Sequence, residues 1–232
     1  MKHNEDSRVK IPTILHLCRL GYTYLPLKSL DFDPTTNIAK DIFSESITRI
    51  NQGIDTSDAE KLLNDISIEL DNDDLGRAFY SRLIEQSGTR LIDFDDFNKN
   101  SFHVVTELAY KKDEEEFRPD ITLLINGMPL AFIEVKKPNN KDGILAERNR
   151  IYTRCQNPFF KKFINITQLM LFSNNMEYDD NSSEPIEGAF YATTSYDTPK
   201  FNYFREEIGF NLQQTLNQES ENIETLVLED NN

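Results

Sequence analysis

The sequence predicts an α/β fold in which helices flank a mixed central β-sheet, with a helical elaboration ahead of the sheet. Over roughly the first ninety residues, apolar side chains recur at helical spacing. From residue 101 onward, β-branched and aromatic residues concentrate in short segments that are typical of strands. A helix-spaced segment and another apolar segment follow them. This order of elements favours a mixed sheet with helices packed around it.

Four helices are expected in the N-terminal part. The first carries Ile11 and Cys18 on one face and ends at Gly21, because glycine readily takes the left-handed conformation that closes a helix. The third begins at Ser57, with Glu60 three residues later, a spacing that matches a capping box. In chain order, the other two helices cover residues 38–51 and 74–86.

The strands and helices of the remaining chain follow from the change in period. We expect strands over 101–110, 117–125, 129–136, 166–173 and 188–195, helices over 142–157 and 201–216, and a charged turn or loop over 111–116. We therefore divide the chain into a helical N-terminal elaboration packed on the core (1–95), the core itself (96–217) and an acidic tail or linker (218–232).

Composition excludes several classes of protein. The two cysteines form no CxxC motif and the three histidines are scattered, which argues against a disulfide framework and a zinc site. Apolar runs are too short to span a bilayer, so no membrane association is expected. The start of the sequence lacks the apolar core of a signal peptide, and we expect a cytoplasmic location.

Charge is unevenly distributed along the chain. The 25 basic and 40 acidic residues give a net charge of −15, which taken alone argues against binding to nucleic acid. Residues 99–170, however, hold 12 Lys and Arg against 9 Asp and Glu, a net of +3. The rest of the chain holds 13 against 31, a net of −18. Any surface that contacts a phosphate backbone should therefore lie within 99–170.

The segment RPDITLLINGMPLAFIEVKKPN (118–139) carries the residues with the clearest chemistry. Glu134 and Lys136 stand two apart on one strand and must point to the same face. A two-residue loop at Asn126-Gly127 would put Asp120 and Glu134 on different faces of the sheet. A three-residue loop through Met128 would instead pair Asp120 with Glu134 across the two strands, so that both side chains lie on the same face. We predict the odd-length loop, pairing Ile125 with Pro129, or an equivalent bulge with Gly127 in a left-handed conformation.

Two carboxylates beside an ammonium group are a plausible set for hydrolysing a phosphodiester. Asp120, Glu134 and the Val135 carbonyl offer the oxygen ligands that Mg²⁺ prefers, with water completing its coordination. The metal would acidify a water molecule and offset charge on a phosphoryl oxygen, while Lys136 would orient or deprotonate the attacking water. By generic spacing alone, the same residues also fit an ordinary exposed strand face with an ion pair.

Together these motifs resemble a known family. The Asp120…Glu134-Val135-Lys136 arrangement resembles the PD-(D/E)xK nuclease motif. The run RPDITLLINGMPLAFIEVKKP is similar to the N-terminal nuclease domain of the motor (R) subunit of type I restriction enzymes, with its R-P-D stretch, N-G-x-P hairpin and E-hydrophobic-K triplet. Weaker similarity extends over residues 4–22 and 166–178.

That resemblance implies a PD-(D/E)xK restriction-endonuclease-like core and an endonuclease that cleaves double-stranded DNA without reading sequence itself. It implies Mg²⁺ as cofactor, with Mn²⁺ as a substitute, Asp120 and Glu134 as metal ligands, and Lys136 as the residue assisting water. Target recognition would belong to specificity and methyltransferase subunits. No GxxxxGK[ST] loop occurs in these residues, so ATP and the translocase it drives are expected of the full-length enzyme only.

The resemblance also suggests residues around this set. The family's Gln-x-x-x-Tyr motif is matched by Tyr152, but Arg148 takes the place of the glutamine and is a candidate phosphate contact. Lys137 is a further candidate for DNA contact, and Glu5 on the opening helix is a candidate acidic residue completing the metal site. Two alternatives stay open: a catalytically silent domain of the same fold that docks the R subunit onto its partners, and a stand-alone nuclease.

Overall fold

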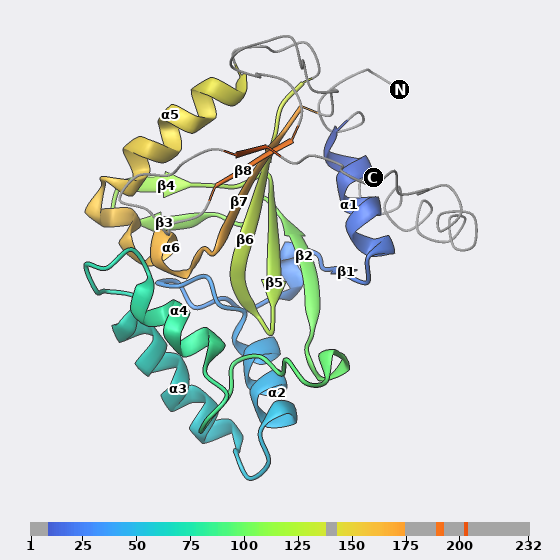
Figure 1. The fold of residues 1–232 in the computed structure, drawn as a ribbon, viewed down its shortest axis with the longest axis vertical. Coiled ribbons are helices and arrows are strands. Elements are labelled where there is room, and N and C mark those ends of the chain that lie inside the picture. The colour runs from blue at the N-terminus through green and yellow to red at the C-terminus, as the bar shows by residue number, and fades with distance from the viewer. Residues whose placement is uncertain (1–8, 138–142, 175–188, 193–201, 204–232) are drawn as a thin grey trace.

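The computed structural model describes residues 9–137, 143–174, 189–192 and 202–203 (Figure 1). Its main sheet combines parallel and antiparallel pairs. Within the described residues, the sheet comprises β1 (Thr23–Tyr24), β2 (Phe102–Thr106), β5 (Ile121–Ile125), β6 (Met128–Val135), β7 (Leu169–Ser173), β8 (Ala189–Ala192) and β9 (Asn202–Tyr203), in that order across it. The predicted mixed α/β class is therefore confirmed.

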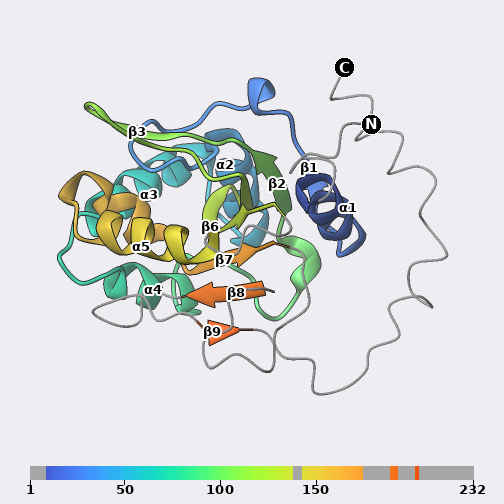
Figure 2. The same ribbon diagram turned by 90° about the horizontal axis from the view of Figure 1, so that it is seen from above.

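Helices cover both faces and one end of this sheet (Figures 1 and 2). Their bounds are α1 (Ile11–Arg19), α2 (Lys40–Ile50), α3 (Thr56–Glu69), α4 (Arg77–Ile84), α5 (Gly143–Cys155) and α6 (Lys161–Ile166). On one face, Ile14 and Leu17 of α1 pack against apolar residues of β2, β5 and β6. Phe132 and Phe172 of the opposite face pack with α5 and α6. The helices α2 to α4 pack around the turn between β5 and β6.

The predicted helices of the N-terminal part are confirmed, with small shifts at their ends. The helix expected over 38–51 begins at Lys40, because Ala39 is extended and its N–H donates to the Gly127 carbonyl at 2.9 Å. The third helix starts two residues earlier than predicted. Its N-cap is Asp55, whose carboxylate accepts the Asp58 N–H, and not Ser57.

Two predicted strands are shorter than expected. The strand over 101–110 ends at Thr106, because Glu107 adopts a positive φ of 57°. The charged segment expected to be a loop instead forms a separate hairpin of β3 (Tyr110–Lys112) and β4 (Glu115–Phe117). This hairpin also takes Phe117 out of the strand predicted over 117–125.

The C-terminal elements differ further from the prediction. The first residues of the segment expected to be a strand over 166–173 belong to the end of α6 and a short connection, so β7 begins only at Leu169. Asn202 and Tyr203 pair with β8, although a helix was predicted over 201–216. The rest of that predicted helix and the tail over 218–232 lie outside the described residues.

The register of the β5–β6 hairpin places Asp120 and Glu134 on the same face of the sheet. Asn126 and Gly127 form a two-residue turn with φ values of 51° and 80°, and Ile125 pairs with Met128. The predicted pairing of Ile125 with Pro129 is therefore wrong. A bulge between the pairs Leu124↔Pro129 and Leu123↔Ala131 supplies the extra residue, as the alternative form of the prediction had it.

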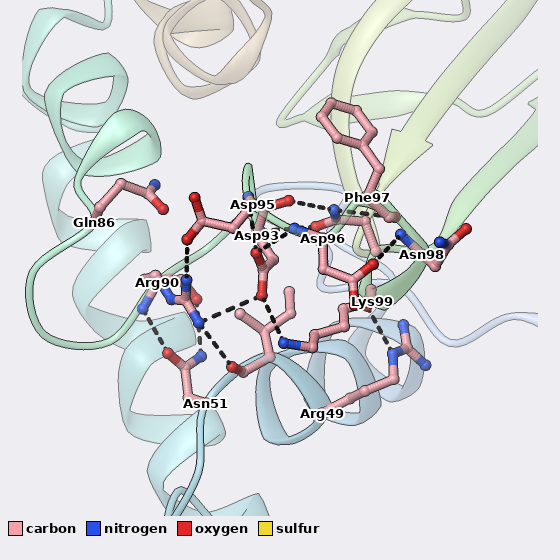
Figure 3. Close-up of polar contacts among 12 residues, drawn as sticks. Arg49, Asn51, Gln86, Arg90, Asp93, Asp95, Asp96, Phe97, Asn98 and Lys99 are labelled. Atoms are coloured by element: carbon pink, nitrogen blue, oxygen red, sulfur yellow. Dashed lines mark hydrogen bonds and ion pairs between the residues drawn. The ribbon is translucent and has the colours of Figure 1, made fainter.

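Buried polar contacts hold this turn in place. The Asn126 side chain, fully buried, accepts the Ser101 N–H at 2.8 Å and donates to Asn100 and to the Leu91 carbonyl. Asn100 belongs to the loop that precedes β2, where the Asp93 carboxylate accepts two backbone N–H groups and contacts Arg90 and Lys99 (Figure 3). The helical part of the chain thereby fixes the position of the hairpin, and with it the register of β6.

Candidate active site

Extending the hairpin register by one residue beyond Ile121↔Ile133 places Asp120 opposite Glu134. The Asp120 carboxylate accepts the Val135 N–H at 2.9 Å, which ties the two strand ends together. Lys136 follows β6 on the same side as Glu134, with its Nζ 3.5 Å from Glu134 Oε2. The structure therefore brings together the three side chains that the sequence singles out.

Glu134 is almost fully buried, at 5% exposure. Burial, and next the negative charge of Asp120, raise the pKa of its carboxyl to about 8. Its Oε1 atom is buried and accepts no hydrogen bond. A buried carboxylate oxygen without a partner is costly in free energy and marks a place where a ligand or proton belongs.

Sequence reasoning missed a third carboxylate in this cluster. Glu147 on α5 is 2% exposed, its Oε1 lies 3.2 Å from Lys136 Nζ, and it also pairs with Arg150. Burial lowers the pKa of the Lys136 ammonium, but the carboxylates of Glu147, Glu134 and Asp120 outweigh it and raise that pKa. Lys136 is thus held as a cation between two buried acids.

A signal for Glu147 was present in the sequence. Glu147 stands four residues before Ile151, which is fully buried, so both lie on the face of α5 that packs on the sheet. A charged residue within the apolar stripe of a helix needs a buried partner. That position could have been identified by asking which acidic residue of the helix falls in register with its apolar face.

A second polar cluster lies on the other side of Asp120. Lys10, next to the start of α1, has its Nζ 3.7 Å from Asp120 Oδ1 and also pairs with Glu107. Arg118 Nε lies 2.9 Å from Glu107 Oε2. At this point the chain presents a lysine beside Asp120, whereas the acidic candidate Glu5 lies outside the described residues.

The remaining candidates from the sequence are less closely associated with the cluster. Lys137 is exposed just after β6. Tyr152 lies on α5 at 49% exposure, and no described contact joins it to Glu134 or Lys136. Arg148 is also part of α5, but its side chain lies outside the described residues. Their assignment as DNA contacts stays a prediction.

Glu134, Lys136 and Glu147 line a pocket of about 330 Å³, and Asp120 is not part of its lining. Its walls come from β4, the end of β6 and α5, and its lining is mostly polar. The residues that line it are Glu116, Phe117, Arg118, Glu134, Lys136, Glu147, Arg150 and Arg154. A phosphate group entering this pocket would therefore meet both a buried acid and several cations.

The carboxylates fit a magnesium ion better than a metal held entirely by protein. Among the described residues, no three His, Cys, Asp or Glu side chains converge into a complete cage. Mg²⁺ needs less, because it commonly binds one or two carboxylates and keeps water in its other positions. The unpartnered Oε1 of Glu134, opposite Asp120, provides such a ligand.

None of the described helices is long and apolar enough to cross a membrane.

Comparison with known proteins agrees with the resemblance seen in the motifs. Residues 2–183 match the family described as "Type I restriction enzyme R protein N terminus". Three proteins of Methanocaldococcus jannaschii named "Putative type I restriction enzyme endonuclease subunit", with the designations MjaIXP, MjaVIIP and MjaVIIIP, are similar to parts of the chain.

Identity to the MjaIXP subunit is 29% over 203 residues, or 76% of this chain and 19% of that protein. Identity to the MjaVIIP subunit is 42% over 52 residues, which cover 22% of this chain and 5% of that protein. Identity to the MjaVIIIP subunit is 34% over 102 residues, which cover 42% of this chain and 9% of that protein. The chain spans about a fifth of the length of the first of these relatives. Since the family match covers most of its residues, the chain belongs to the family of type I restriction enzyme R subunit N-terminal regions.

Proposed function

We propose that this chain is the Mg²⁺-dependent endonuclease domain of a type I restriction R subunit. It would hydrolyse phosphodiester bonds of double-stranded DNA without sequence specificity of its own. An ATP-driven translocase in the full-length enzyme, and the specificity and methyltransferase subunits of its complex, would deliver the DNA. The observation that carries the proposal is the buried Glu134, with its unpartnered oxygen, set opposite Asp120 and beside Lys136.

The central hairpin and the parallel strand β7 beside it support a PD-(D/E)xK core in this proposal. Asp120 and Glu134 stand on two adjacent antiparallel strands, and Lys136 follows Glu134 by two residues. Strand β7 pairs in parallel with β6, and its Ser173 carbonyl accepts the Lys136 N–H at 2.8 Å. The backbone that presents the cluster is therefore hydrogen-bonded on both sides.

Each residue has a role in the proposed reaction. Asp120, Glu134 and the Val135 carbonyl would hold Mg²⁺, whose chemistry is Lewis-acid stabilisation of the negative charge that develops on the phosphoryl oxygens. Lys136 would donate hydrogen bonds to the attacking water and to the phosphate, because Glu147 keeps it charged and directed into the pocket. The sequence also allowed Lys136 to accept a proton from the water. That role fits less well, because the surrounding carboxylates raise the pKa of the Lys136 ammonium and keep it protonated.

Plasmid nicking tests the proposal. The wild-type chain is compared with Asp120→Ala and Lys136→Ala in Mg²⁺ and in Mn²⁺. Metal-dependent nicking that both substitutions abolish supports the nuclease, whereas nicking that survives Asp120→Ala contradicts the assigned site. If the isolated chain is inactive, the same substitutions are made in the full-length enzyme. Loss of cleavage with translocation retained supports the proposal, and unchanged cleavage refutes it.

Metal binding separates this proposal from a silent docking domain. A functional site binds Mn²⁺ in a calorimetric titration and loses that affinity in Asp120→Ala. The docking alternative has no need for such binding. The intact carboxylate pair, with one oxygen left without a partner, is the observation that favours the nuclease.

A further inference from the structure

Four cations line the pocket beside Glu134, and three of them are already paired. Arg118 contacts Glu107, Arg150 contacts Glu147, and Lys136 contacts both Glu134 and Glu147. Arg154 differs from them, because within the described part of the chain it forms no ion pair or hydrogen bond.

The guanidinium of Arg154 is nevertheless held in place. Its central carbon lies 3.6 Å from the centroid of the Phe117 ring, which is an aromatic face well suited to a cation. Its Nη1 atom is buried without a hydrogen-bond partner. Stacking fixes the plane of a guanidinium without using its N–H donors, so those donors stay available to a ligand that enters the pocket.

Arg154 also stands where two hollows meet. One is the pocket of about 330 Å³ that contains Glu134 and Lys136. The other, of about 460 Å³, continues along α5 and is lined in part by Asn149 and Thr153. Both hollows share Arg154, Arg150 and Glu116. An extended anionic chain passing from one to the other would therefore run directly past Arg154.

We propose that Arg154 binds a phosphodiester group of the DNA strand being cut, next to the scissile phosphate, and that the hollow along α5 receives the strand beyond it. This proposal rests on the proposed function, since it places the scissile phosphate at Glu134 and Lys136. Arginine suits the task because its planar donors match the oxygens of a phosphate and its charge persists at every relevant pH.

The acidic residues in the walls do not oppose this assignment. Glu147 is neutralised by Lys136 and Arg150. Glu134 faces the proposed metal position, and Glu116 is exposed on β4, where water screens its charge. Glu147 and Glu134 also act on the charge of Arg154, but neither lies within ion-pair distance of it, so its charge and N–H donors can still attract an anion.

Duplex binding without metal tests the proposal independently of cleavage. A fluorescent 20-base-pair duplex is titrated with the full 232-residue chain in EDTA, at several salt concentrations starting from low salt, and anisotropy gives the Kd. Arg154→Met keeps an unbranched side chain beside Phe117 but removes the guanidinium that stacks on the ring, and with it the charge and the N–H donors. Arg154→Lys keeps the charge but removes the planar donors. The matched control is Arg19→Met, on α1 at the opposite face of the sheet.

We expect Arg154→Met to weaken binding about tenfold, the loss typical of one charge-assisted hydrogen bond. The slope of log Kd against log salt should also fall by about one, because one phosphate contact is lost. Arg154→Lys should recover part of the affinity, and Arg19→Met should bind as the wild type does. Equal binding by Arg154→Met and the control, or no duplex binding by the wild type at low salt, would overturn the proposal.

A second measurement on the wild-type protein guards against misfolding of the variant. Arginine residues are modified with phenylglyoxal with and without the duplex and are located by mass spectrometry. The duplex should protect Arg154 and leave Arg19 reactive, while equal modification of Arg154 in both samples would refute the contact. Failure of the nuclease proposal can be distinguished from failure of the Arg154 proposal. If only the nuclease proposal is wrong, Arg154→Met still weakens duplex binding, but no metal supports nicking by the wild-type protein.

Discussion

The buried carboxyl of Glu134 should make the metal-free protein less stable as the pH rises. Burial, and next the charge of Asp120, raise the pKa of Glu134 from its ordinary value of 4.5 to about 8 in the folded state. Between these two pH values the folded chain binds more protons than the unfolded chain, so the free energy of unfolding falls with increasing pH. Glu134→Gln carries no charge at any pH and removes this dependence.

The structure sets the size of the effect. Each pH unit within the window lowers the free energy of unfolding by at most about 1.4 kcal/mol, so the rise from 4.5 to about 8 bounds the total at roughly 5 kcal/mol. The gain in the free energy of unfolding of Glu134→Gln is smaller than this bound, because Lys136 loses its ion pair with Glu134 and keeps only the one with Glu147. We expect Glu134→Gln to be more stable than the wild type by about 2 kcal/mol at pH 8, a Tm higher by roughly 4–8 °C.

Thermal unfolding in EDTA at pH 5, 6.5 and 8 measures this difference, with Glu60→Gln on the exposed side of α3 as the matched control. The advantage of Glu134→Gln should grow with pH and vanish near pH 5, where the folded wild type is protonated at this site. Addition of Mn²⁺ at pH 8 should raise the Tm of the wild type and of Glu60→Gln, but not that of Glu134→Gln. A variant that is less stable than the wild type at pH 8, or a difference that does not change with pH, would refute the reasoning.

Three further predictions concern the hairpin and the charged cluster. Gly127→Ala should lower the free energy of unfolding by about 2–4 kcal/mol in denaturant titrations, because its Cβ would lie 2.6 Å from a backbone oxygen of the neighbouring segment at a φ of 80°. Gly53→Ala, which has a similar φ but open space around it, should lose only about 1 kcal/mol, and equal losses would contradict the packing argument. Glu147→Gln should lower the free energy of unfolding more in the wild-type background than in Lys136→Ala, whereas equal losses in the two backgrounds would show that Glu147 acts independently of Lys136. Asp120→Asn retains an oxygen for its backbone hydrogen bond, yet its calorimetric Kd for Mn²⁺ should rise at least about tenfold, and unchanged affinity would remove Asp120 from the metal site.

The hairpin shows how far sequence patterns determine the candidate site. The Asn126-Gly127 pair predicts the turn, and the functional grouping of Asp120 with Glu134 requires one extra residue between them. A longer loop and a bulge both supply that residue, and both place the carboxylates on one face. Sequence alone does not separate these solutions. The structure selects the bulge, because the buried side chain of Asn126 and the close backbone contact of Gly127 require the tight turn.

Two features were missed because their stabilising partners are distant or charged. The β3–β4 hairpin has no apolar alternation along KKDEEE; its strands are matched by opposite charges, with Lys111 facing Glu116 and Lys112 facing Glu115. The role of Glu147 depends on a lysine eleven residues earlier in the chain, at the end of another element. Periodicity describes each element by itself, and it carries no information about which charged groups from separate elements meet in the interior.

The pairing of charges in the pocket bears on how a domain of net charge −15 could act on DNA. Lys136, Arg150 and Arg118 are largely neutralised by carboxylates of the chain itself, so within the described residues only Arg154 offers the pocket an unpaired cation. One such contact gives weak affinity against the repulsion of the surrounding acidic surface. On the proposed function, DNA must therefore be brought to the pocket by other parts of the enzyme, whose attachment raises the local concentration to the millimolar range for a short flexible connection. Weak intrinsic binding then favours cleavage only where the translocase has already delivered a duplex.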